Sequence, residues 1–264
     1  MNTHSTKLFI ILLSVSCCGI NGMEKEQRSK RKAITSMVEY KAAENALSKL
    51  VFADNEEVLH VGALPVGVHC TNIIKKKASS LRTSNIQAHT MSKFMDEYGK
   101  HYDKILTFAS WDVVKNTESI FRNSVRLLKS DGLFCAVLPY AYDKSPYLKM
   151  YHETFMSDKW KDFYNKDKEI QVLGRSVMIK KLREAGIKVA TCEIVKKPFV
   201  FKTKEKFMEW AASYEGELDD LIPQERHAEF TQDVVFNYLE KYPSMTDGSV
   251  KLYLPYMIIS GYKA

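Results

Sequence analysis

Residues 57–62 read Glu57-Val58-Leu59-His60-Val61-Gly62, a short run of apolar side chains that stops at a glycine. A run of this kind before a glycine predicts a strand that ends in a tight turn. A helix-compatible stretch, Thr71 to Lys77, comes shortly after it. A strand, a turn and a helix in this order predict the first unit of an α/β fold.

The same alternation continues towards the C-terminus. Strands are predicted at 102–108, 133–138, 187–194 and 252–262, with a weak strand at 86–88; helices are predicted at 34–50, 120–128, 175–185, 207–214 and 225–241. The second of these helices is expected to stop at residues 129–132, with Gly132 in the left-handed conformation. One α/β domain with a mostly parallel sheet follows from this order.

The composition is that of an ordinary folded protein. The chain has 264 residues, of which 45% are hydrophobic and 27% are charged. These values exclude a collagen and an intrinsically disordered chain. The net charge of +7 is too mild to indicate a nucleic-acid partner, and the sequence contains no recognisable nucleic-acid-binding module.

The N-terminus has the pattern of a secretory signal peptide over residues 1–22. Its apolar run, Leu8 to Val15, is far shorter than the roughly 20 residues that a membrane span needs. Secretion is therefore expected, and the alternative is an apolar first helix of a cytosolic domain. Residues 23–33 form a basic arm, either processed or simply solvated, and residues 34–264 form the domain. Removing residues 1–22 leaves three cysteines that do not make a disulfide framework: Cys70, Cys135 and Cys192.

Several motifs keep their order over most of the chain. They are 57–62, 102–105 with Ser110-Trp111, 127–137, Lys159-Trp160, 199–201 and 221–223. In this order they resemble the class I S-adenosylmethionine-dependent methyltransferases, and most closely the juvenile hormone acid methyltransferases of arthropods. The resemblance implies a Rossmann-like sheet with flanking helices, shortened near the second strand. It also implies a helical cap formed by residues 140–170 and 203–241.

The resemblance also implies a cofactor site, from which this sequence departs. The family has an acidic residue in the first motif, a glycine-rich loop and a second carboxylate on strand two that holds the ribose hydroxyls. Here His60 replaces the first acid, and larger residues replace the glycines expected between Gly62 and Gly67. No Asp or Glu occurs from Val58 to Met95, so a ribose carboxylate would have to come from elsewhere in the chain, such as Asp96 or Glu97. The alternative is a strand-to-helix turn without a ligand.

Two further residues match positions that orient the substrate in the resembling family. Trp111 matches a tryptophan that positions the acid substrate, and Glu39 falls where the family often has Gln. A carboxylate at position 39 would repel an acid. The aromatic segment 140–164 suits an elongated apolar ligand such as a terpenoid or fatty acid, or it forms a helix-packing core.

These observations leave two hypotheses. In the first, the chain is a secreted pseudoenzyme with impaired cofactor binding that binds a small lipophilic acid or a partner. In the second, it is an active O-methyltransferase of a small carboxylic acid with S-adenosylmethionine as its cofactor. The pair His69-Cys70 lacks further ligands at recognisable spacing, so no metal site is predicted.

Overall fold

The computed structural model describes residues 38, 40–62, 64–78, 80–86, 101–108, 117–140, 145–164, 173–213 and 221–264. The predicted signal peptide (1–22) and basic arm (23–33) lie outside these residues. So do Glu39, Asp96, Glu97 and Trp111. Among the described residues, no helix is both long enough and apolar enough to cross a bilayer.

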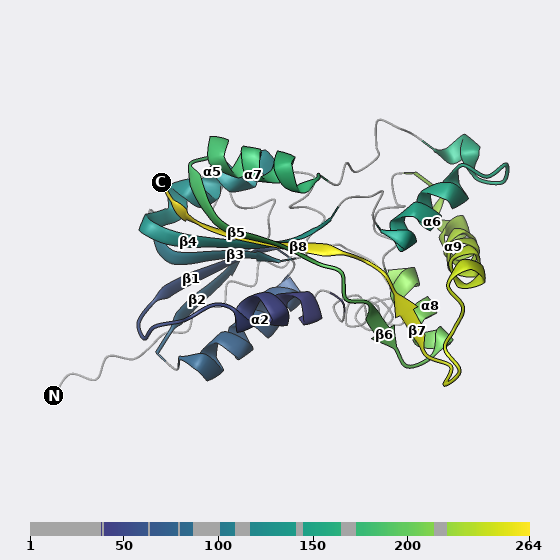
Figure 1. The fold of residues 1–264 in the computed structure, drawn as a ribbon, viewed down its shortest axis with the longest axis horizontal. Coiled ribbons are helices and arrows are strands. Elements are labelled where there is room, and N and C mark those ends of the chain that lie inside the picture. Colours follow the sequence, from purple (N-terminus) through teal and green to yellow (C-terminus); the bar gives the residue numbers. More distant parts are fainter. Residues whose placement is uncertain are drawn as a thin grey trace, which may run out of the picture.

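A central sheet of six strands runs through the larger part of the molecule, in the order β2-β1-β3-β4-β8-β5 (Figure 1). The strands are β1 (Glu57–Gly62), β2 (Arg82–Ile86), β3 (Tyr102–Phe108), β4 (Leu128–Pro139), β5 (Ile187–Val195) and β8 (Tyr256–Lys263). The pairs β1–β2, β1–β3 and β3–β4 are parallel, and β8 is antiparallel to both β4 and β5. The predicted mostly parallel α/β sheet is therefore confirmed.

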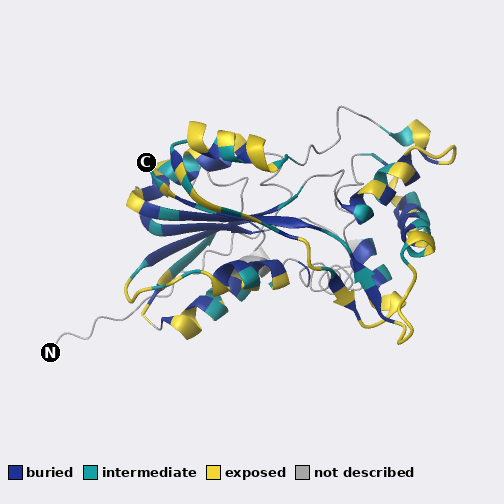
Figure 2. Ribbon diagram, in the orientation of Figure 1, coloured by how far each residue is buried: buried dark blue, intermediate teal, exposed yellow. Residues whose placement is uncertain are grey.

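Helices cover both faces of the sheet (Figure 1). One face carries the helical residues 40–48 and helix α2 (Leu64–Lys77), and the other carries α5 (Thr117–Leu127) and α7 (Arg175–Glu184). Because side chains alternate along a strand, β1 supplies Val58 to the α2 side and Leu59 and Val61 to the α5 side. Figure 2 shows the result: the central strands are mostly buried, and the helices are exposed on their outer surfaces.

A second group of elements lies beyond the carboxyl end of β4 (Figure 1). It contains α6 (Pro146–Phe155), η3 (Lys161–Phe163), α8 (Lys204–Ser213), η6 (Gln224–Arg226), α9 (His227–Lys241) and the antiparallel pair β6 (Phe199–Phe201) and β7 (Val250–Leu252). Ser145 caps α6 by accepting a hydrogen bond from the Leu148 N–H at 3.3 Å. This group, here called the cap, falls within or next to the two segments from which a helical cap was expected.

Strand β2 differs from its prediction. The sequence suggested a weak strand at 86–88, whereas β2 spans Arg82–Ile86 and pairs in parallel with β1 from Glu57↔Arg82 to Val61↔Ile86. Its sequence, RTSNI, is mostly polar, so the hydrophobic pattern was too weak to locate it. The second strand is therefore present, and the expected shortening concerns residues 87–100, which lie outside the described residues.

Helix α2 also begins earlier than predicted. It starts at Leu64 rather than Thr71, with Pro65 in its first turn, where a missing N–H costs nothing. The predicted strand 252–262 is two strands, β7 and β8, because Pro255 between them has no N–H to donate to a ladder.

At residues 129–132, which lie inside β4 where its pairing with β3 is irregular, the sequence predicted the wrong residue in the left-handed conformation. Asp131 has a φ of 59°, and Gly132 is not among the residues with a positive φ. Gly132 is required there for a different reason: a larger residue would not fit, because its Cβ would lie 2.9 Å from the Lys129 carbonyl oxygen. Gly186, which follows α7, has a φ of 96°, so a glycine in the left-handed conformation closes this helix.

Candidate functional site

The strand order places a topological switch point at β1. The chain leaves β1 to form β2 on one side and later returns to form β3 on the other. In doubly wound sheets, ligands bind in the crevice outside the carboxyl ends of the strands at such a point. The candidate site, here called the switch-point site, therefore consists of the ends of β1 and β2 and the start of α2.

The connection from β1 to α2 is short. Gly62 ends β1 with a φ of 150°, a backbone conformation that glycine adopts readily, and α2 begins at Leu64. Gly67 falls inside the bounds of α2. The two glycines that the sequence singled out therefore flank a strand-to-helix turn, and they do not belong to one extended glycine loop.

His60 is buried in the sheet, with 3% of its surface exposed. Among the described residues, neither ring nitrogen has a hydrogen-bond partner, and the ring centroid lies 5.8 Å from that of Phe108. Burial lowers the pKa of His60 to about 4, so the side chain is neutral at physiological pH. A neutral imidazole offers no negative charge to the ammonium group of a cofactor.

Asn85 of β2 is the register partner of His60. Its Nδ2 donates a hydrogen bond to Thr71 Oγ1 of α2 at 3.2 Å, and its buried Oδ1 has no partner in the part of the chain that the structure describes. The described end of β2 thus carries an amide and no carboxylate. The described residues of the switch-point site do not fit S-adenosylmethionine, because both expected negative charges are missing.

The pair His69-Cys70 lies on α2, where its two side chains have different surroundings. His69 Nε2 lies 2.9 Å from Glu44 Oε1, and its ring stacks on Tyr40 with centroids 4.3 Å apart. Cys70 is buried, which raises the pKa of its thiol to about 12. Within the described ranges, no group of three or more His, Cys, Asp and Glu side chains is arranged to hold a metal ion.

Three large aromatic residues of the segment 140–164 form the core of the cap. Tyr147, Phe155 and Trp160 are each no more than 2% exposed. Trp160 Nε1 donates to Asp233 Oδ2 at 2.8 Å, and the guanidinium of Arg226 lies 4.3 Å from the centre of the Trp160 ring. For these three residues, the helix-core interpretation of the aromatic segment is confirmed.

A groove with a volume of about 620 Å³ lies at the opposite, amino end of the parallel strands. It is here called the amino-end groove. Its lining includes Lys49, Leu50, Val51, Glu56, Asp103, Lys104, Lys129, Asp131, Leu133, Thr191, Glu193, Ile258, Ser260 and Tyr262. The sequence gave no signal for this groove, because its charges come from five separate segments.

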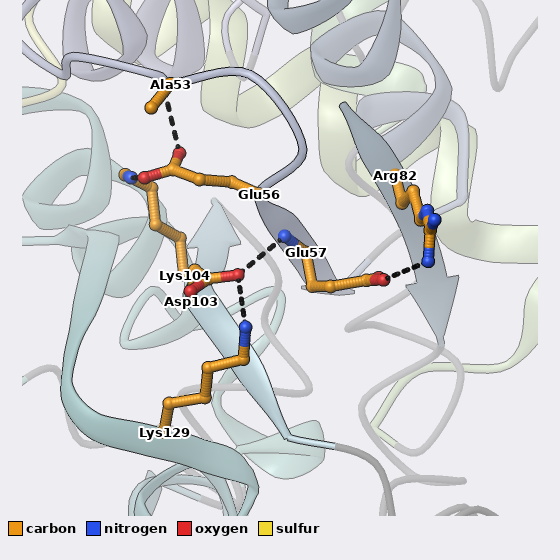
Figure 3. Close-up of polar contacts among 7 residues, drawn as sticks. All are labelled: Ala53, Glu56, Glu57, Arg82, Asp103, Lys104 and Lys129. Carbon is orange, nitrogen blue, oxygen red and sulfur yellow. Dashed lines mark hydrogen bonds and ion pairs between the residues drawn. The ribbon is translucent and has the colours of Figure 1, made fainter. Parts of the chain in front are cut away.

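Ion pairs fix the wall of the groove (Figure 3). Lys104 pairs with Glu56, and Lys129 Nζ lies 2.8 Å from Asp103 Oδ2, which also accepts the Glu57 N–H at 2.8 Å. Burial alone would raise the pKa of Asp103, but the Glu57 N–H and the two lysines outweigh it and hold the pKa below its usual value. Asp103 therefore remains ionised and ties the starts of β1, β3 and β4 together.

The strand order and the switch-point site define a Rossmann-like α/β protein. No protein-family model and no curated protein matches the sequence. Among solved structures, the chain is similar to a Bacillus halodurans protein assigned as a methyltransferase, with 15% identity and a TM-score of 0.49 over 84% of this chain and 98% of that one. Coclaurine N-methyltransferase bound to N-methylheliamine and SAH is similar at 13% identity and a TM-score of 0.44, over 93% of this chain and 89% of that one.

The cyclopropane synthase MmaA2 from Mycobacterium tuberculosis is a third similar structure. Its identity is 9% and its TM-score 0.44, over 84% of this chain and 82% of that one. These similarities concern the general architecture only.

Proposed function

We propose that this chain is an exported methyltransferase-fold protein, related to the juvenile hormone acid methyltransferases, that has lost effective binding of S-adenosylmethionine. It acts by binding a ligand or a partner. The observation that carries this proposal is the pair His60 and Asn85. They are register partners at the carboxyl ends of β1 and β2, and both are uncharged where the cofactor would need acids.

The energetic consequence is large. A hydrogen bond to a charged group contributes about 1.5–3 kcal/mol. Losing two of them corresponds to a loss of about 10²- to 10⁴-fold in affinity. The short turn from Gly62 to α2 also leaves little backbone to wrap around the amino acid part of a cofactor. S-Adenosylmethionine would therefore bind only weakly.

The expected signal peptide is a second, independent argument for a function that does not need S-adenosylmethionine. S-Adenosylmethionine is mainly an intracellular metabolite, so an exported chain would meet little of it. Edman sequencing or mass spectrometry of the chain from the medium of expressing cells should find an N-terminus beyond residue 19. Recovery of the intact chain from the cytosol alone would contradict export.

The ligand proposed for the cap side is a small lipophilic acid. Some aromatic side chains of the segment 140–164 keep exposed surface: Tyr140, Tyr151 and Tyr164 are only partly buried, and Tyr151 and Tyr164 pack against the cap core with one side. Partly exposed aromatic rings suit the hydrocarbon of a terpenoid or fatty acid. Organic extraction of the purified chain, followed by mass spectrometry, would identify such a ligand.

An active O-methyltransferase of a small carboxylic acid is the second candidate, and the retained switch point favours it. Methylation of a carboxylate needs mainly proximity and orientation, because the nucleophile is already charged. In this case Trp111 and Glu39 would position the acid.

The two candidates are separated by methyl transfer from S-adenosylmethionine labelled with tritium in its methyl group. The chain is incubated with a panel of terpenoid and fatty acids, and a known carboxyl methyltransferase serves as the positive control. We expect no ester above background. Labelled ester that requires the intact chain would establish the enzyme and overturn the proposal.

A further inference from the structure

The amino-end groove is separate from the switch-point site, because the two lie at opposite ends of the parallel strands. Its apolar lining includes Leu133 of β4, Ile258 of β8 and Leu50, which comes just after the helical residues 40–48. Its volume of about 620 Å³ falls in the range of about 300–1,000 Å³ that is typical of small-molecule sites. The groove is therefore large enough for an organic ligand.

The charges of the groove are not balanced. Its three lysines are each paired with an acid: Lys49 with Glu193, Lys104 with Glu56, and Lys129 with Asp103. The fourth acid, Asp131, is exposed, and within the part of the chain that the structure describes its carboxylate has no ion-pair partner. The groove thus presents one uncompensated negative charge.

Asp131 is held in an unusual backbone conformation, with a φ of 59°. Aspartate and asparagine tolerate this left-handed region better than most residues. The tight turn that resumes the β3–β4 pairing at Leu133 fixes this conformation. The carboxylate is therefore attached to a defined point of the groove wall.

An exposed aromatic ring lines the same groove. Tyr262 is 48% exposed and is the register partner of Leu133. Leu133 follows Asp131 by two positions in β4. Val51, which is 84% exposed, adds an apolar side chain. A carboxylate, an aromatic ring and an apolar lining together have the chemistry that holds an organic ammonium group with a hydrocarbon tail.

We propose that the amino-end groove binds a small amphipathic organic cation. Asp131 and the ring of Tyr262 receive the ammonium group, and the hydrocarbon part lies over Leu133, Leu50 and Ile258. This proposal holds whether or not the switch-point site binds S-adenosylmethionine.

The test is calorimetric titration of the chain with octyltrimethylammonium below its micelle concentration. Octyl sulfate and tetramethylammonium are the comparison probes, because the first inverts the charge and the second removes the tail. We expect octyltrimethylammonium to bind more tightly than either. Octyl sulfate binding equally or better would overturn the proposal, since the groove would then not select a cation.

Two variants assign the binding to the groove. Asp131→Asn keeps a residue that tolerates a positive φ and removes the charge, so it should fold normally and bind the cation about two- to fivefold more weakly. Tyr262→Leu should weaken binding to a similar extent. The matched control is Asp158→Asn, which removes an acid that is 98% exposed on the cap and should leave binding unchanged. Wild-type affinity in Asp131→Asn, with an unchanged urea midpoint, would contradict the assignment.

A titration with S-adenosylhomocysteine in the presence of octyltrimethylammonium distinguishes the two proposals. Independent binding of both molecules would overturn the proposed loss of cofactor affinity and leave the cation site standing. Competition between them would overturn the cation site, because the two sites lie at opposite ends of the sheet.

Discussion

Acidification should destabilise this protein through His60. The folded pKa is about 4, against 6.5 for an exposed histidine. Between these values the unfolded chain binds a proton that the folded chain does not. Stability therefore falls as the pH drops from about 6.5 to about 4. The complete shift corresponds to about 3 kcal/mol, and about 2 kcal/mol of this is lost by pH 5.

The assay is urea unfolding at pH 7 and pH 5 for the wild type and for His60→Leu. Leucine fills the site with apolar atoms and removes two buried, unpartnered nitrogens. At pH 7 the variant should be at least as stable as the wild type, because an unsatisfied buried polar group costs about 1–3 kcal/mol. At pH 5 the variant should lack the loss of about 2 kcal/mol that His60 causes.

The control is Thr107→Val. Thr107 is also buried, and its Oγ1 has no hydrogen-bond partner among the described residues, but its side chain does not titrate. Its pH dependence should match that of the wild type. The reasoning is refuted if His60→Leu and the wild type lose the same free energy between pH 7 and pH 5. Asp103 and the other carboxylates act equally in both proteins, so the comparison cancels them.

Two further substitutions, Gly261→Ala and Asp233→Ala, test the packing, and each has a control substitution. Gly261→Ala should lower the free energy of unfolding by about 1–3 kcal/mol or more, because the new Cβ would lie 2.5 Å from a backbone carbonyl oxygen of β5. Gly174→Ala, with no described atom within 4 Å of the new Cβ, should change it by less than about 1 kcal/mol. Equal effects of the two substitutions would show that β5 and β8 do not approach each other this closely. Asp233→Ala should cost about 1–3 kcal/mol in urea unfolding because it leaves the buried indole N–H of Trp160 unpaired, whereas Asp162→Ala on the cap surface should be neutral.

The sequence was sufficient to predict those elements whose hydrophobic pattern is strong. Strand β3 has the predicted bounds, and β1, α7 and β5 differ from their predictions by one residue. Strand β2 was misplaced because its sequence is polar at an edge of the described sheet, where pairing with β1 replaces the hydrophobic signal. The early start of α2 was missed because Pro65 reads as a helix breaker unless its place in the first turn is known.

The candidate site could be predicted in part. The sequence singled out His60 and Gly62, and the structure places both at the end of β1. It could not show that Asn85 is the register partner of His60, because strand pairing is a property of the folded sheet. The sequence could not reveal the amino-end groove for the same reason, since Tyr262 is placed next to Leu133, two residues from Asp131, by the pairing of β4 with β8. Trp111 and Glu39 remain predictions.

The central claim is that the switch-point site no longer holds the cofactor. Its most direct test is calorimetric titration of the chain, without residues 1–22, with S-adenosylhomocysteine at pH 7.5. S-Adenosylhomocysteine shares the amino acid, ribose and adenine of the cofactor and cannot be turned over. We expect no measurable heat at concentrations where a methyltransferase is saturated. A dissociation constant in the micromolar range would contradict the account.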